Sequence, residues 1–137
     1  MRFEDSKYST ILDYTKVSFS FGSFYLLDKF IISEMKEGVH FDWEKIQQVI
    51  AVLIEHYGNT IKIAHISNRI NSYSIEPQLW IKFNKDFGFV VASAIVSYSE
   101  INYVNATIEK RFSENSIKRC LNLDEAINWV LNLKEFN

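Results

Sequence analysis

The segment FVVASAIV, residues 89–96, is the feature that most constrains the fold of this chain. Its side chains are apolar or small at every position, so it lacks the alternation of a strand with one face in water. A strand buried on both faces is typical of a parallel sheet that helices cover on either side. The sequence therefore predicts an α/β domain.

Strand-like and helix-like stretches alternate along the rest of the chain. Residues 17–21 alternate between apolar and polar side chains, and residues 24–27, 61–66 and 116–121 are further predicted strands. Residues 30–35 either form another strand or continue the strand 24–27 past a kink at Asp28-Lys29. We expect helices after Asp42, Ser74, Ser97 and Asn122, with Gly58 ending the first. This order predicts one domain, 1–137, with a mixed, partly parallel sheet of about five strands and about four helices. Residues 1–14 carry a weak pattern and are expected to form a loosely ordered extension.

Two of these helix starts make specific predictions. Ser74 would cap a helix with Glu76 and Pro77 in its first turn. Ser97 and Glu100 would form a reciprocal capping box. The buried face of the helix after Ser97 would consist of Ile101, Val104, Ile108 and Phe112.

The charge and the cysteine content restrict the partners and the cellular compartment that we expect for this chain. The net charge is −2, and the densest basic cluster, Lys110-Arg111, is preceded by Glu109, which disfavours a nucleic-acid partner. A single cysteine, Cys120, excludes an internal disulfide and fits a reducing compartment. The N-terminus lacks a signal-peptide core, and no apolar run is long enough to span a membrane. We expect a cytoplasmic protein.

Two quoted segments resemble the STAS-like domains, the group that includes anti-sigma-factor antagonists. FIISEMKEGVHFDWEKIQQVIAVLIEHYG is similar to the opening of that group, where a strand and an "EG" turn lead into a long helix. NATIEKRFSENSIKRCLNLDEAINWVLNL is similar to its end. The resemblance covers roughly residues 24 to 133. It implies a regulatory or protein-binding domain without chemistry of its own, in which a serine at the end of a central strand is phosphorylated. That serine follows an Asp and lies beside a Gly, whereas Ser67 here has neither neighbour.

The stretch that follows Ile66 is the predicted site. In open α/β sheets, ligands bind beyond the carboxyl ends of the strands. We expect a loop here to bind a ligand or a protein partner through its polar side chains, with Arg69 as an anion or partner contact. The candidate residues are Ser67, Asn68, Arg69, Asn71, Ser72 and Ser74. The alternative is that Asn and Ser only build turns and caps.

The leading hypothesis is a non-enzymatic interaction domain that binds a protein partner or forms a homodimer. A second hypothesis is a small-molecule or lipid site lined by Phe83, Phe87 and the sheet. A third is an enzyme that uses His65 with Ser67 or Cys120, although no recognised catalytic motif occurs. The histidines share no metal-ligand spacing, so neither a metal nor a cofactor is expected.

Overall fold

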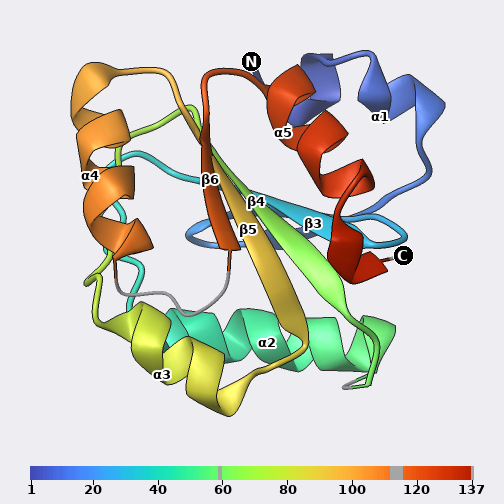
Figure 1. The fold of residues 1–137 in the computed structure, drawn as a ribbon, viewed down its shortest axis with the longest axis horizontal. Helices are drawn as coiled ribbons and strands as arrows, with labels where there is room; N and C mark the ends of the chain where they lie inside the picture. The colour runs from blue at the N-terminus through green and yellow to red at the C-terminus, as the bar shows by residue number, and fades with distance from the viewer. Residues whose placement is uncertain (59, 112–115, 137) are drawn as a thin grey trace.

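The structure is a computed structural model, and it describes residues 1–58, 60–111 and 116–136. In these ranges a six-stranded sheet runs in sequence order, β1-β2-β3-β4-β5-β6 (Figure 1). The strands are β1 (Thr15–Phe19), β2 (Gly22–Leu26), β3 (Phe30–Met35), β4 (Ile63–Arg69), β5 (Val90–Ser97) and β6 (Ser116–Cys120). The first three pair antiparallel, and β3 to β6 pair parallel. The predicted mixed, partly parallel α/β sheet is confirmed.

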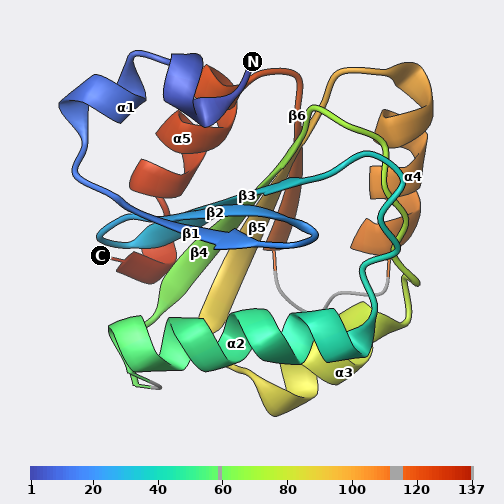
Figure 2. The ribbon, with the colours of Figure 1, turned by 180° about the vertical axis from the view of Figure 1, so that it is seen from behind.

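Helices cover both faces of this sheet (Figures 1 and 2). The first face carries α2 (Trp43–Tyr57), α3 (Leu79–Asp86) and α4 (Glu100–Lys110). The opposite face carries α5 (Leu123–Leu131) and the N-terminal pieces, a 3-10 helix (Phe3–Asp5) and α1 (Tyr8–Ile11). A second 3-10 helix, Lys134–Phe136, follows α5. The sixth strand arises because the Asp28-Lys29 turn separates β2 from β3, and the fifth α-helix is the short α1.

Strand β5, which lies between β4 and β6, is buried on both faces, as its composition predicts. Ala92, Ala94 and Val96 pack in the core beneath α5. The side chains between them turn to the opposite face, where Ile95 packs with Trp80 of α3 and Ala106 of α4. Strand β5 therefore contributes side chains to two hydrophobic cores, one on each face of the sheet.

Helix α2 begins and ends where its sequence predicts. Asp42 Oδ1 accepts from the backbone N–H of Lys45 at 3.0 Å, which satisfies one of the free amides of the first turn. At the other end Gly58 has φ +79°, a backbone conformation that favours glycine. Its buried face consists of Ile46, Val49, Ile50 and Leu53.

Strand β4 is longer than the sequence predicts, and α3 starts later. The expected loop residues Ser67, Asn68 and Arg69 belong to β4, and α3 begins at Leu79 with Gln78 as its N-cap. Ser74 therefore does not cap a helix. Polar side chains remain in this buried strand because each finds a buried hydrogen-bond partner, which no local pattern reveals.

Helix α4 buries a different face from the predicted one. Val104 and Ile108 are 52% and 43% exposed, whereas Ala106 and Glu109 are buried. Phe112 and the side chain of Ile101 lie outside the described part. The helix turns this way because Glu109 pairs with Arg69 beneath it. The predicted capping box is also wrong, since Ser97 is the last residue of β5 and its Oγ has no partner in the described chain.

The N-terminal segment packs on the sheet, where the sequence predicted loose order. Phe3 is fully buried, with its ring centroid 5.0 Å from that of Tyr14 and 4.9 Å from that of Tyr25. Its backbone N–H donates to Glu34 Oε2 at 2.7 Å. A single buried aromatic and one buried hydrogen bond thus tie the start of the chain to β2 and β3.

Candidate functional site

The sheet divides the predicted site residues between its two faces. Successive side chains of a strand point to opposite sides, so Ser67 and Arg69 point to the face that carries α2, α3 and α4, whereas Asn68 points to the other face, toward Glu34 and Met1. Asn71, Ser72 and Ser74 follow in the connection to α3. The structure therefore brings Ser67 and Arg69 together and separates them from Asn68.

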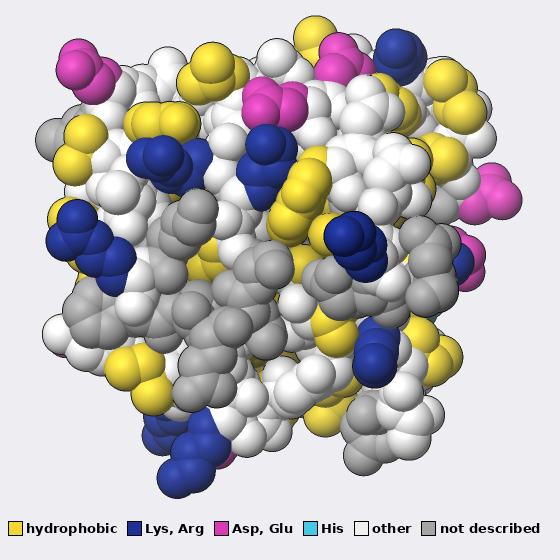
Figure 3. All heavy atoms as spheres, viewed as in Figure 1, with side chains coloured by type: hydrophobic (Ala, Val, Ile, Leu, Met, Phe, Trp, Pro, Cys, Tyr) yellow, Lys and Arg dark blue, Asp and Glu magenta, His cyan; other side chains and the backbone are white. Residues whose placement is uncertain are grey.

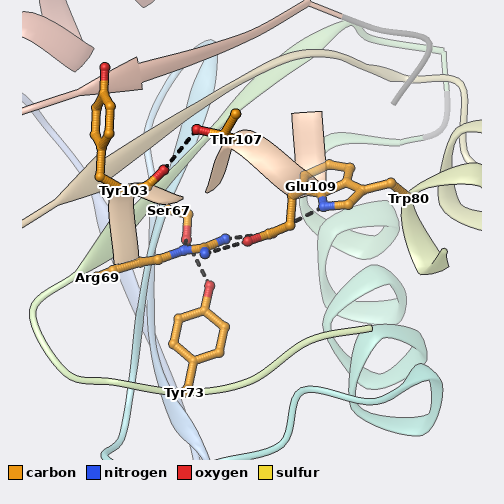
Figure 4. A network of polar contacts seen from close by, with 7 residues as sticks. All are labelled: Ser67, Arg69, Tyr73, Trp80, Tyr103, Thr107 and Glu109. Atoms are coloured by element: carbon orange, nitrogen blue, oxygen red, sulfur yellow. Dashed lines mark hydrogen bonds and ion pairs between the residues drawn. The ribbon is translucent and has the colours of Figure 1, made fainter. Parts of the chain in front are cut away.

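Arg69 lies in a buried ion pair that joins β4 to α4 (Figure 4). Its Nη2 is 2.7 Å from Glu109 Oε1, and its Nη1 binds Glu109 Oε2, so the contact is bidentate. Trp80 Nε1 of α3 donates to the same Oε1 at 3.1 Å. Arg69 is 6% exposed. In this conformation its charge is paired inside the fold, and the guanidinium does not reach the surface as an open anion contact.

Asn68 holds a second buried network on the opposite face. Its Nδ2 donates to Glu34 Oε2 at 2.7 Å and to the Met1 carbonyl at 2.9 Å. Its Oδ1 accepts from the Tyr98 hydroxyl at 2.7 Å. Burial raises the pKa of the Glu34 carboxyl despite the hydrogen bonds that it accepts from Phe3 and Asn68. Asn68 thus anchors the N-terminal segment.

A cavity of about 60 Å³ lies between the sheet and helices α2 and α3. Its walls are aliphatic and aromatic, with Phe24, Ile31, Ile50, Leu53, Leu79 and Phe83 among them. Its floor is polar and comes from two neighbouring strands, with Ser33 on β3 and His65, Ser67 and Arg69 on β4. Because Ser33 pairs with Ser67 in the β3–β4 register, these groups form one patch.

Hydrogen bonds fix the orientation of the floor. Ser33 Oγ lies 2.8 Å from His65 Nε2, and Ser67 Oγ lies 2.8 Å from the Tyr73 hydroxyl. Arg69 Nε donates to Ser67 Oγ at 3.1 Å. Burial, aided by the nearby charge of Arg69, lowers the pKa of His65 to about 4. The imidazole is therefore neutral at neutral pH.

Residues 70–76 cover the cavity, and we call them the roof segment. Tyr73 and Ile75 line the cavity, whereas Ser72, Ser74 and Glu76 are exposed. The roof segment is tied to the chain that precedes α2: Gly38 N–H donates to the Ser72 carbonyl at 2.8 Å, and Phe41 N–H donates to the Ser74 carbonyl at 2.8 Å.

Side-chain hydrogen bonds also hold the roof segment against the chain that precedes α2. Asn71 Nδ2 donates to the Met35 carbonyl at 3.1 Å, and Ser74 Oγ lies 2.7 Å from His40 Nδ1. Of the predicted site residues, Asn71 and Ser74 thus hold the roof segment in place. Ser72 is exposed, and its backbone N–H donates to Glu37 Oε2 at 3.1 Å.

Of the side chains in the enzyme hypothesis, His65 and Ser67 share the cavity floor and Cys120 lies elsewhere. His65 contacts Ser33 rather than Ser67, and Cys120 is buried with α5 on the other side of the sheet. Burial raises the pKa of the Cys120 thiol to about 11, which makes it a poor nucleophile at neutral pH. Among the described residues that line the cavity there is no carboxylate to orient His65.

Several residues of the site are not predicted by the sequence. Ser33 and Glu34 interrupt the apolar strand FIISEM, and that interruption is a signal that could have drawn attention to them. Glu109 and Tyr73 carry no such signal, because only the fold brings them to Arg69 and Ser67. Trp80 is also buried, and its Nε1 donates to Glu109 Oε1.

The surface and the helices add two observations. On the face shown in Figure 3, Lys and Arg side chains lie in several separate places among apolar and neutral polar groups. None of the helices in the described part of the chain combines the length and apolar character needed to cross a bilayer.

Comparison with known proteins identifies the fold. The structure is similar to that of an uncharacterised protein of the DUF3478 family with a SpoIIAA-like fold, from Shewanella loihica PV-4. The TM-score is 0.55 at 12% identity, over 87% of this chain and 93% of that one. No family model and no curated protein match the sequence. The chain therefore has the SpoIIAA-like fold, which is the STAS-like, anti-sigma-factor-antagonist-like fold that the two sequence segments resemble.

Proposed function

We propose that this chain is a non-enzymatic regulatory domain that binds a small amphipathic molecule in the cavity beneath the roof segment. The observation that carries the proposal is the convergence of apolar walls on a small polar floor. Ligand sites in proteins commonly have this composition, with few polar groups that fix the orientation of a mainly apolar ligand. Ser33, His65, Ser67 and Tyr73 supply those groups here.

The cavity volume limits the size of the ligand. An apolar cavity of about 150 Å³ holds a benzene molecule, and the present one is about 60 Å³. By that measure the cavity accommodates about two to three heavy atoms at the end of a ligand, and a longer chain requires the roof segment to move. A probe of five heavy atoms gains at most about 7 kcal/mol on binding, so micromolar or weaker dissociation constants are expected.

Titration with 1-butanol, followed by protein NMR, tests the proposal. We expect saturable shifts at Leu53, Tyr73 and Ile75, which line the cavity. The substitution Ile75→Trp places a large ring at the cavity and should abolish these shifts. Ile81→Trp makes the same change at an exposed position of α3 and should leave them intact. Shifts spread over the surface, or equal binding by both variants, would refute a cavity site.

A second candidate is protein binding through the outward side of the roof segment. The supporting observation is that Ser72, Ser74 and His40 are exposed on a backbone already held by hydrogen bonds to residues 38–41. A preorganised surface loses little conformational entropy when a partner docks. The partner of this proposal is another protein or a second copy of the chain.

Native mass spectrometry and partner capture test this candidate. Ser72→Arg introduces a bulky charge on the outward side, and Ser18→Arg is a matched control on the exposed strand β1. Loss of a dimer mass, or of a captured partner, in Ser72→Arg alone would support the roof segment as the contact surface. Equal behaviour of the two variants would argue against it.

A further inference from the structure

We propose that the cavity selects a ligand whose polar end is uncharged, such as a hydroxyl, carbonyl or amide group, and discriminates against carboxylates, phosphates and ammonium groups. This inference rests on the proposed function and specifies its ligand class. It follows from the balance of charge and hydrogen-bonding capacity at the floor of the cavity.

The first step concerns the cation that borders the cavity. Arg69 would be the natural partner of an anionic ligand, but both of its terminal nitrogens bind Glu109. Its remaining Nε donates to Ser67. An anion that bound the remaining N–H groups would share the guanidinium charge with Glu109, and an anion that drew Arg69 away would leave that buried carboxylate with Trp80 alone. Breaking a buried ion pair in this way is strongly unfavourable.

The second step concerns the other floor groups, which are neutral. His65 is held neutral in a buried position beside Ser33, and Ser67 is bonded to Tyr73. A hydroxyl can donate and accept, and a neutral imidazole offers one donor and one acceptor. The floor can therefore satisfy an alcohol, a carbonyl or an amide by rotating hydroxyl protons, without any change in net charge.

The third step concerns the walls. Ile31, Ile50, Leu53 and Leu79 offer no compensation to an ion. A charge moved from water into such surroundings loses its hydration, and the loss is large unless an opposite charge is present. An ammonium group meets no free carboxylate among the cavity-lining residues that the structure describes, so it is disfavoured as well.

Three probes of one chain length test the inference: 1-butanol, butyrate and n-butylammonium, titrated separately at pH 7 and followed by protein NMR. We expect 1-butanol to bind in the cavity at least tenfold more tightly than either ion. Binding of butyrate or butylammonium as tight as that of 1-butanol would overturn the selectivity while leaving the cavity site standing. Failure of all three to bind would overturn both the site and the selectivity.

Two variants test the cause of the selectivity. Glu109→Gln keeps a hydrogen-bonding group near Arg69 but removes the compensating charge, so butyrate should gain at least tenfold in affinity while 1-butanol changes little. The double variant Arg69→Met with Glu109→Leu removes both charges and should retain the preference for 1-butanol. An unchanged butyrate affinity in folded Glu109→Gln, or a lost preference in the double variant, would show that the ion pair does not set the selectivity.

Discussion

Arg69 and Glu109, forty residues apart in the sequence, meet in a bidentate ion pair that fastens helix α4 to strand β4. Both side chains are almost completely buried. Desolvation offsets much of the attraction in such a pair, but loss of one partner leaves the other charge buried and uncompensated. Each of the two buried charges therefore needs the other as its counter-ion for the fold to stay stable.

The first prediction follows from this dependence. Glu109→Ala should lower the free energy of unfolding by about 3–5 kcal/mol, because Arg69 would stay buried without its counter-ion. Urea unfolding measures the change, and Glu100→Ala at the exposed start of the same helix is the control, expected within about 0.5 kcal/mol of the wild type. Equal effects of the two substitutions would mean that the ion pair does not hold α4.

Asn122 offers a prediction about the start of α5. Its Oδ1 accepts from the backbone N–H of Glu125 at 2.8 Å. Asn122→Ala removes this acceptor and should cost about 1 kcal/mol of unfolding free energy. Asn128→Ala, in the exposed middle of α5, should be neutral or slightly stabilising because alanine is the better helix former. Thermal or urea unfolding of both variants checks the pair, and a loss at Asn128 as large as at Asn122 would contradict the cap.

Glu34 gives a prediction about pH. Burial raises the pKa of its carboxyl, so the native state binds its proton more readily than the unfolded chain. The contribution of Glu34 to stability is then fully present below the ordinary pKa and is lost as pH rises through the raised value. Relative to Glu34→Gln, the wild type should become more stable when the pH is lowered from 7 toward 4.5.

Urea midpoints measured across that pH range test this prediction. Glu44→Gln, which changes an exposed glutamate of α2, controls for the general effect of removing a carboxylate. A wild type that loses stability relative to Glu34→Gln on acidification would have the opposite sign to the one expected from burial.

For His65 we predict a pH dependence of stability with the opposite sign to that of Glu34. Its pKa is about 4 in the folded chain, below the ordinary value near 6.5. The unfolded chain therefore binds the proton first, and stability should fall by about 3 kcal/mol as the pH drops from 6.5 to 4. NMR of the ring protons should give a midpoint about 4. A midpoint near 6.5 would show that the ring is not held in the cavity floor.

The sequence predicts the order of strands and helices and several helix ends well, because these depend on local patterns. Asp42, Gly58 and Asn122 mark helix ends through hydrogen bonds and backbone conformations that involve only neighbouring residues. The run from Phe89 to Val96 predicts a strand buried on both faces because such burial requires apolar or small side chains at every position.

The site was harder to predict because its polar groups are satisfied across the fold. Arg69 suggested an exposed contact, and only Glu109, on a distant helix, makes its burial possible. The same partnership reverses the expected face of α4 and leaves Val104 exposed. Where a buried charge decides the orientation of a helix, the hydrophobic pattern of that helix alone predicts the wrong face.

The alternation within the roof segment has a consequence for communication across the protein surface. Tyr73 and Ile75 line the cavity, while Ser72 and Ser74 are exposed on the same short length of backbone. A molecule that displaced the inner side chains would therefore shift the outer ones through the chain that they share. By thermodynamic reciprocity, a partner that preferred one position of Ser72 and Ser74 would change the affinity of the cavity by the same factor.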